Sequence, residues 1–212
     1  MESRGAGKQV RKPPAERRNE MVGAAARVAL GEGLECVTLR RVAEELGVRA
    51  GLVGHYFPVA EELVAEAFAS ATMAELDSLL PEVPDGRSGR GALDAVRELL
   101  ARIGGAEFDD VSRLWLNARH LSRYRPVLRD QVVSQELLWC RRLEQVVAEG
   151  VNGGVFGCED PWTAAVRVLV AIDGTGSYVN TSADRRSAAV DGLVRDLTET
   201  VLGLSPGALR AP

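Results

Sequence analysis

The sequence has few of the residues on which enzymes and metal proteins most often depend. Its 212 residues include only two histidines, His55 and His120, and three widely separated cysteines, Cys36, Cys140 and Cys158. An odd number of distant cysteines suits neither a disulfide framework nor a zinc cluster, so we expect buried, inert thiols. No glycine-rich phosphate loop, His-Glu-x-x-His or Gly-x-Ser-x-Gly motif occurs. We therefore predict no catalytic residue, no metal ligand and no cofactor.

Long apolar runs are missing as well. No stretch approaches the roughly 18 uninterrupted apolar residues that a membrane-spanning helix needs. The N-terminal segment MESRGAGKQVRKPP is polar and has no apolar core that would act as a signal peptide. We therefore expect a cytoplasmic protein that has no membrane partner.

Charge is distributed unevenly along the chain. Residues 1–57 contain ten Lys and Arg against seven Asp and Glu, whereas the remainder contains sixteen against twenty-three, and the net charge is −4. A basic segment joined to an acidic remainder is typical of a phosphate-facing module on a body that does not bind DNA.

Apolar residues recur at helical spacing through most of the chain. In the stretch LRRVAEEL, for example, Leu39, Val42, Ala43 and Leu46 lie at offsets 0, 3, 4 and 7. No alternating pattern of useful length indicates a strand, so we predict an all-α fold. The expected helices span residues 15–31, 39–46, 50–57, 59–80, 92–103, 109–123, 126–149, 161–179 and 183–204.

The short helices near the N-terminus predict a helix-turn-helix. Thr38 stands where an N-cap is expected, and Gly47 follows the first short helix as a left-handed terminator. Two short helices joined by such a turn cross at a steep angle and form a DNA-binding motif. We therefore expect a disordered basic arm (1–14), a three-helix helix-turn-helix domain (15–58) and a C-terminal helical bundle for ligand binding and dimerisation (59–212). The arm either contacts DNA or is only a solubilising tail.

The segment AARVALGEGLECVTLRRVAEELGVRAGLVGHYFPVAEEL resembles the TetR family of transcription regulators. Within it, GLVGHYF is most similar to the subgroup of choline-sensing repressors of the betaine pathway, and DPWTAAVRVLVAIDG is loosely similar to the same subgroup. The resemblance implies a repressor that a small molecule releases from DNA. Gly54 and Ala60 depart from the family pattern, which often has Tyr and Lys there to contact phosphate.

A recognition helix places its N-terminal residues against base edges in the major groove. Arg49 is the candidate for reading guanine, because its guanidinium can pair with O6 and N7 together. Ala50 and Gly51 allow close approach, and His55 and Tyr56 would reach phosphates or pack at the rim. Thr38 is either a phosphate contact or only an N-cap, and Arg40 and Arg41 are either phosphate contacts or a solvated helix face.

One such module covers only a few base pairs, so we expect a homodimer that reads a palindromic operator in double-stranded DNA. The last two helices are the predicted dimer surface, because Ala171, Gly174, Gly176 and Ser177 permit close approach and Leu193 and Leu197 supply apolar area. The alternative is that these faces pack only within the subunit.

The bundle is where a small-molecule effector should bind, in a mostly apolar pocket with a few convergent polar groups. Asp173 interrupts the apolar stretch VRVLVAIDGTG, and two Trp residues lie on helices that would face it. A cation stacked between the Trp rings near Asp173 would suit the choline-like resemblance. The alternatives are that the Trp residues are only core and that Asp173 bonds a helix end. The candidate pocket residues are Phe68, Trp115, Arg119, His120, Trp139, Leu143, Asp173 and Tyr178.

Two other functions stay open from the residues alone. A helical enzyme would use His120 beside Asp173 as its base, and it would turn over a ligand without binding promoter DNA. A protein-interaction scaffold that has lost DNA binding would agree with the departures at Gly54 and Ala60. Steep salt dependence of DNA binding would distinguish a regulator from such a scaffold.

Overall fold

The computed structural model describes residues 13–84, 86–103, 106–181, 190 and 192–210. All regular structure in these residues is helical, which confirms the predicted all-α fold. The elements are α1 (Pro14–Glu32), the 3₁₀ helix η1 (Leu34–Cys36), α2 (Leu39–Leu46), α3 (Ala50–Tyr56), α4 (Ala60–Leu79), α5 (Gly89–Arg102), α6 (Ala106–Ser122), α7 (Pro126–Asn152), α8 (Pro161–Thr181) and α10 (Leu193–Val201).

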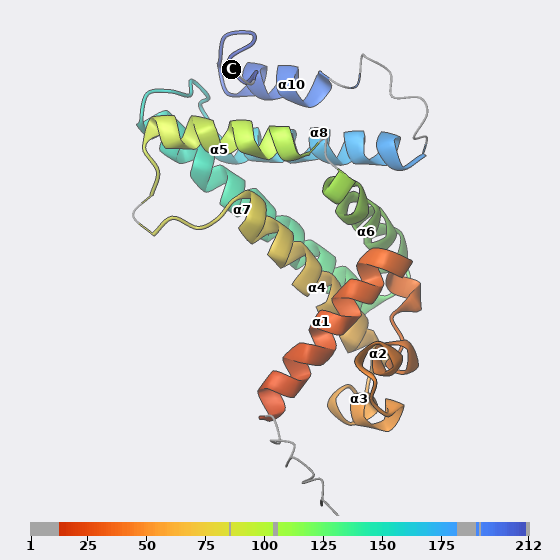
Figure 1. Ribbon diagram of the computed structural model, residues 1–212. Coiled ribbons are helices and arrows are strands. Elements are labelled where there is room, and N and C mark those ends of the chain that lie inside the picture. The colour runs from red at the N-terminus through yellow and green to blue at the C-terminus, as the bar shows by residue number, and fades with distance from the viewer. Residues whose placement is uncertain (1–12, 85, 104–105, 182–189, 191, 211–212) are drawn as a thin grey trace, which may run out of the picture.

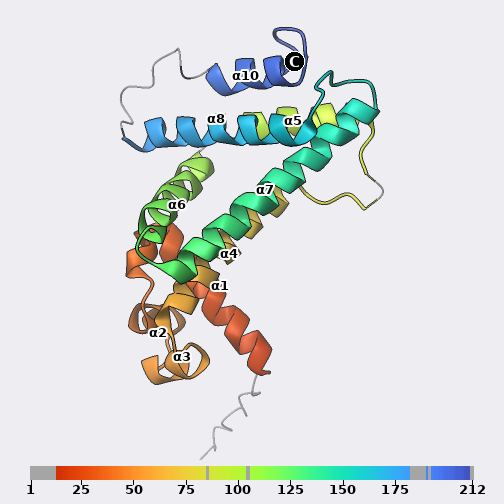
Figure 2. The same ribbon diagram turned by 180° about the vertical axis from the view of Figure 1, so that it is seen from behind.

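The helices form an elongated arrangement with two distinct ends (Figure 1). The short helices α2 and α3 lie at one end, and α8 and α10 lie alongside each other at the opposite end, as the reverse view in Figure 2 also shows. The long helices α4 and α7 pack against each other and run between these ends, while α1 packs along α4. The N-terminal helical module thus packs against the bundle through α1 and α4.

The helix-turn-helix forms where the capping residues require it. The Thr38 hydroxyl accepts a hydrogen bond from the backbone N–H of Arg41 at 3.1 Å, which satisfies an unpaired donor at the start of α2. Gly47 ends α2 with φ 65°, in the left-handed region that favours glycine. Both features confirm the predicted caps. The first helix differs slightly, because α1 continues through Gly31 and ends only at Gly33.

The N-terminal module has an apolar core that reaches α4. Val42, Val53 and Phe57 are buried together with residues of α1. The guanidinium carbon of Arg18 lies 4.6 Å from the centre of the Phe57 ring, and the same group forms a bidentate ion pair with Glu66 of α4. Stacking and a bidentate pair fix a side chain in two directions, so α1 and α4 hold the module in one orientation.

The C-terminal segment folds back on α10. The Glu199 carboxylate accepts hydrogen bonds from the backbone N–H groups of Gly207 and Leu209, both at 2.8 Å. Arg97 of α5 donates to the carbonyl of Ala208 at 2.9 Å. The predicted helix 183–204 is only partly described, because residues 182–189 and 191 lie outside the described residues, as does the predicted arm up to residue 12.

None of the described helices is long and apolar enough to span a membrane.

Candidate functional site

The first turn of α3 is exposed on the surface of the helix-turn-helix. Arg49, Ala50 and Gly51 are exposed, whereas Val53 and Phe57, on the other side of the helix, are fully buried. A side chain at Gly51 would meet no protein atom within 4 Å. The protein interior therefore does not require glycine at this position, and the free backbone is available to an external partner.

Arg40 and Arg41 are paired with carboxylates of the same module. The Nε atom of Arg40 lies 2.9 Å from Glu44, and the guanidinium of Arg41 donates to Glu32 at 3.0 Å and to Glu45 at 3.2 Å. The hydrogen bond that Arg41 donates to Glu32 is the main cause that raises the pKa of Arg41. Arg41 thus joins α1 to α2, which makes it a weaker candidate for phosphate than the sequence suggested.

Arg49 differs from these two arginines. Within the described part of the chain it has no carboxylate partner. The side chain is exposed at the N-terminus of α3, where base contacts are made in helix-turn-helix proteins. His55 is also exposed, and its ring meets Tyr56 edge-to-face at 5.5 Å, while Tyr56 packs partly on the core.

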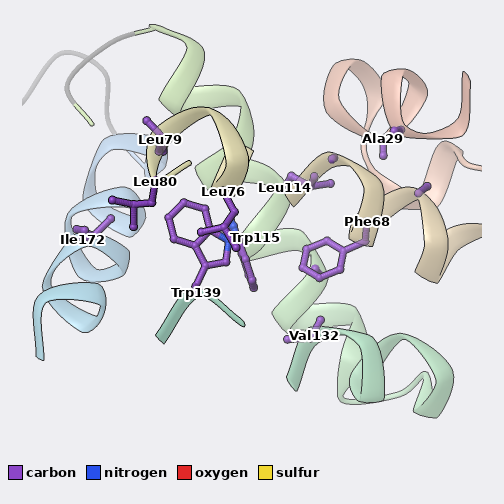
Figure 3. Close-up of a cluster of buried hydrophobic side chains, with 14 of the residues drawn as sticks. Ala29, Phe68, Leu76, Leu79, Leu80, Leu114, Trp115, Val132, Trp139 and Ile172 are labelled. Atoms are coloured by element: carbon purple, nitrogen blue, oxygen red, sulfur yellow. The ribbon is translucent and has the colours of Figure 1, made fainter. Parts of the chain in front are cut away.

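A cavity of about 300 Å³ lies inside the bundle, between α4, α5, α6, α7 and α8. Figure 3 shows Trp115 and Trp139 among Leu76, Leu79, Leu80 and Ile172 in a buried hydrophobic cluster, and Trp115, Trp139, Leu79 and Ile172 of this cluster also line the cavity. Most of the wall is apolar, and the charged groups in it are few. The lining residues with titratable or charged side chains are Glu75, Arg119, Glu136, Cys140 and Asp173.

Arg119 organises the polar part of the cavity. Its guanidinium donates to Glu136 at 2.9 Å and to Asp173 at 2.7 Å, and its central carbon lies 5.0 Å from the centre of the Trp115 ring. Burial raises the pKa of Asp173, although the charge of Arg119 and its hydrogen bond oppose the shift. A cation from the protein itself therefore bridges α6, α7 and α8 and lies over an aromatic face.

Two polar atoms in the cavity wall have no partner. Among the described residues, nothing forms a hydrogen bond with the buried Oε2 atom of Glu75 or with the Nε1 atom of Trp139. Burial raises the pKa of Glu75 to about 7, partly opposed by a hydrogen bond between its carboxyl group and Trp115. Buried polar atoms are normally paired, so these two mark the part of the cavity that is suited to a ligand.

The helix that carries the Trp115 wall also contacts the N-terminal module. The Oδ1 atom of Asn117 accepts a hydrogen bond from the backbone N–H of Leu34 at 2.9 Å, and its Nδ2 atom donates to the Glu35 carboxylate at 2.8 Å. Asn117 lies between Trp115 and Arg119 in sequence, so α6 contacts the cavity with one face and η1 with another.

Comparison with models of known protein families identifies the family of this chain. A family model described as "BetI-type transcriptional repressor, C-terminal" matches residues 89–206, more than half of the chain. A second model, described as "Bacterial regulatory proteins, tetR family", matches residues 22–67. The chain belongs to the TetR family. Among curated proteins, none matches it significantly.

Solved structures of TetR-type regulators share the fold. A putative regulator from Saccharomonospora viridis, in complex with choline, has 24% identity and a TM-score of 0.68 over 88% of this chain and 96% of its own. A putative TetR-family regulator from Rhodococcus sp. has 20% identity and a TM-score of 0.72 over 89% and 99%. One from Cytophaga hutchinsonii has 16% identity and a TM-score of 0.74 over 92% and 99%.

TetR-family proteins are DNA-binding transcription regulators that respond to small molecules and usually act as dimers. The chain is therefore a ligand-responsive regulator of this family. The tetR-family model covers the helix-turn-helix helices α2 and α3 and the start of α4, and the C-terminal model covers the chain from α5 to α10.

Half of the pocket residues that the sequence suggested line the cavity in the bundle. Trp115, Arg119, Trp139 and Asp173 line it together. The other four lie outside the lining: Phe68 packs behind Trp115 with ring centres 4.9 Å apart, Leu143 is buried in the core, and His120 and Tyr178 are exposed. His120 and Tyr178 are outside it because their positions on α6 and α8 turn them toward solvent.

Sequence reasoning missed Glu75 and Glu136, although a pattern could have identified both. Glu75 lies three residues after Thr72 and seven after Phe68, in the buried stripe of α4. Glu136 lies three residues before Trp139 on α7. A carboxylate within an apolar stripe is the same pattern that pointed to Asp173.

The prediction of buried, inert cysteines is wrong for Cys36, which is exposed in η1. Cys140 and Cys158 are half-buried, and burial raises the pKa of each thiol, which lowers its reactivity.

Proposed function

We propose that this TetR-family regulator binds a palindromic operator as a homodimer and releases it when a small organic cation occupies the cavity between α4 and α8. The observation that carries the proposal is the cavity wall, which holds three carboxyl groups, Glu75, Glu136 and Asp173, against one guanidinium, Arg119, beside two Trp rings. Arg119 pairs with Glu136 and Asp173, and Glu75 has no such partner among the described residues. Such a wall favours a positively charged guest.

The choline-sensing resemblance supports a cationic effector as well. The Saccharomonospora viridis regulator that shares this fold is in complex with choline. At 24% identity, that similarity supports the same fold for this chain. The preference for a cation is inferred from the carboxylates that line the cavity of this chain. The effector class proposed is therefore an ammonium compound small enough for about 300 Å³.

On DNA, the exposed first turn of α3 would enter the major groove. Arg49 would read guanine, with Ala50 and Gly51 allowing the backbone to come close. Thr38 would direct its backbone or hydroxyl to phosphate. Two such helices on a two-fold dimer would lie about 34–36 Å apart, one turn of the duplex.

Two helices connect the cavity to this surface. The α4 helix begins three residues after Phe57 of the N-terminal module and contributes Glu75 and Leu79 to the cavity. The α6 helix contributes Trp115 and Arg119 and contacts η1 through Asn117. An effector acts only if it binds more tightly to the dimer shape with the wrong spacing of recognition helices. A difference of about 2 kcal/mol would change operator affinity roughly thirtyfold.

Selection of bound duplexes from random DNA, with Arg49→Ala beside the unaltered protein, tests this function. We expect the unaltered protein to enrich a palindrome and Arg49→Ala to lose about fivefold to a hundredfold discrimination at symmetric guanine positions. Arg129→Ala is the control, because Arg129 lies exposed on α7 and, among the described residues, forms an ion pair with Asp130 alone. Recovery of no palindrome, or an equal loss for every sequence with Arg49→Ala, contradicts the proposal.

A further inference from the structure

We infer that the effector carries an N–H-bearing ammonium group next to a hydrogen-bond acceptor, with Glu75 accepting from the ammonium and Trp139 donating to the acceptor. The inference rests on the proposed function, because it takes the cavity between α4 and α8 to be the effector site. It identifies two specificity-determining residues and separates primary and secondary amines from quaternary ammonium compounds.

Glu75 provides the acceptor. Its side chain lines the cavity, and its Oε2 atom is buried without a hydrogen-bond partner among the described residues. A buried carboxyl oxygen that lacks a donor costs free energy, which a donor brought by a ligand would recover. A hydrogen bond with Trp115 and the charges of Asp173 and Arg102 act on the Glu75 carboxyl group. Its Oε2 atom nevertheless has no hydrogen-bond donor among the described residues.

Trp139 provides the donor. Only 8% of its surface is exposed, and its indole N–H has no acceptor in the described part of the chain. An indole nitrogen can only donate, so the missing partner must be an acceptor such as a hydroxyl, ether or carbonyl oxygen. Trp139 and Glu75 come from α7 and α4 and line the same cavity, so one small molecule can satisfy both.

Arg119 excludes the usual cage for a quaternary cation. It already pairs with Glu136 and Asp173, and it lies over the Trp115 ring at 5.0 Å. The aromatic face and the two carboxylates that would surround a trimethylammonium group are therefore engaged by the chain's own guanidinium. The remaining acceptor, Glu75, is best satisfied by a directed N–H bond, and a quaternary nitrogen has none to give.

The apolar part of the cavity wall determines the size and the apolar character of the rest of the effector. Leu79, Leu99, Leu116, Ile103 and Leu169 contribute to a lining that is mostly hydrocarbon. A cavity of about 300 Å³ is at the small end of ligand pockets and suits roughly one aromatic ring with a short polar chain. The compound 2-amino-1-phenylethanol has this shape, with an ammonium and a hydroxyl on neighbouring carbons.

The test is calorimetric titration of the full chain with 2-amino-1-phenylethanol and with its N,N,N-trimethyl derivative. We expect the primary amine to bind about tenfold to a hundredfold more tightly, the range for a hydrogen bond to a charged group. Glu75→Gln should remove most of this preference. Asp77→Asn, a matched change two residues further along α4 at an exposed carboxylate that pairs with Arg142, should leave it intact.

A second pair of probes examines Trp139. The hydroxyl group distinguishes 2-amino-1-phenylethanol from 2-phenylethylamine, so Trp139→Phe should reduce the preference between them about threefold to tenfold while keeping the ring. Trp162→Phe is the control, because Trp162 lies outside the cavity lining. Thermal melts of each variant establish that it is folded.

Equal or tighter binding of the trimethyl derivative, an unchanged preference in Glu75→Gln, or no binding of either amine at millimolar concentration overturns the inference. Each of these results leaves the proposed function standing as long as the unaltered protein still enriches a palindrome. If the unaltered protein enriches no palindrome but still prefers the primary amine, the proposed function is contradicted and the inference about the ligand stands.

Discussion

Glu75 holds its proton unusually tightly in the folded protein. Burial is the main cause of the pKa of about 7, and the charge of Asp173 adds to it, while Trp115 and Arg102 oppose the shift. The ordinary value is 4.5, so the unfolded chain loses this proton at lower pH than the folded chain does. Between these two values the folded state binds more protons, and the free energy of unfolding therefore falls as pH rises.

We expect Glu75→Gln to be more stabilising at pH 8 than at pH 5. The ionised carboxylate costs about 3 kcal/mol at most above pH 7, and glutamine removes that cost while resembling the protonated acid. Urea unfolding of both proteins at pH 5 and pH 8 measures the difference. Asp77→Asn should show no such dependence. An equal effect of Glu75→Gln at both pH values contradicts the pKa assignment.

Individual cavity residues could be predicted where one side chain broke a clear pattern. Asp173 interrupts an apolar run, and the Trp residues at 115 and 139 lie on the faces that α6 and α7 turn inward. Whether the ring of His120 or Tyr178 faces the cavity or the solvent depends on the rotation of α6 or α8 about its own axis. A rotation smaller than the angle between two successive residues is enough to change the outcome. Sequence periodicity does not resolve such a rotation, because tertiary packing determines it.

The α6 helix has two working faces. Trp115 and Arg119 face the cavity, whereas Asn117 bonds the backbone of Leu34 and the carboxylate of Glu35. A shift of α6 that follows occupation of the cavity would therefore move the segment that leads into α2. Hydrogen bonds between two elements can transmit such a shift because they hold a defined geometry.

Asn117→Ala should weaken the response to the effector more than it weakens DNA binding. Removing its bonds to η1 should reduce the ratio of operator affinities without and with effector by about twofold to thirtyfold, which corresponds to 0.5–2 kcal/mol of coupling. Fluorescence anisotropy with a labelled operator measures both affinities. Asn152→Ala, at the exposed end of α7, is the matched control. An unchanged ratio in a folded Asn117→Ala protein argues against this route.

Helix existence and most helix ends followed from capping chemistry. Thr38, Gly47 and Pro161 stand where the chain begins or ends a helix in the structure. The contacts between elements did not follow in the same way. The Arg18 pair with Glu66 and the Asn117 bonds join residues 48 and 83 positions apart, and no local pattern reveals such pairings.

The helices α8 and α10 lie at the end of the molecule opposite α3 (Figure 1). They carry exposed apolar side chains: Tyr178 is 67% exposed, Val170 63% and Leu193 48%. These helices are the ones that the sequence suggested for dimerisation, and TetR-family proteins usually act as dimers. A second copy of the chain is the partner that we expect to cover this surface.

Leu193→Glu should therefore shift the protein toward monomer. A charge buried in an apolar interface is costly, so we expect the dimer dissociation constant to rise about tenfold or more. Sedimentation equilibrium measures it, and operator affinity should fall with it. Val127→Glu, a similar change at an exposed position on α7, is the control. Unchanged self-association of Leu193→Glu places the dimer surface elsewhere.

The ion pairs of Arg119 affect how the cavity responds to inorganic cations. Because a guanidinium already sits between Glu136 and Asp173, abundant inorganic ions find those two carboxylates occupied. Fluctuations of potassium or magnesium would then leave the cavity unchanged and trigger no false induction. We therefore expect a regulator that does not respond to these common ions and that responds to a molecule contacting Glu75 and Trp139 together.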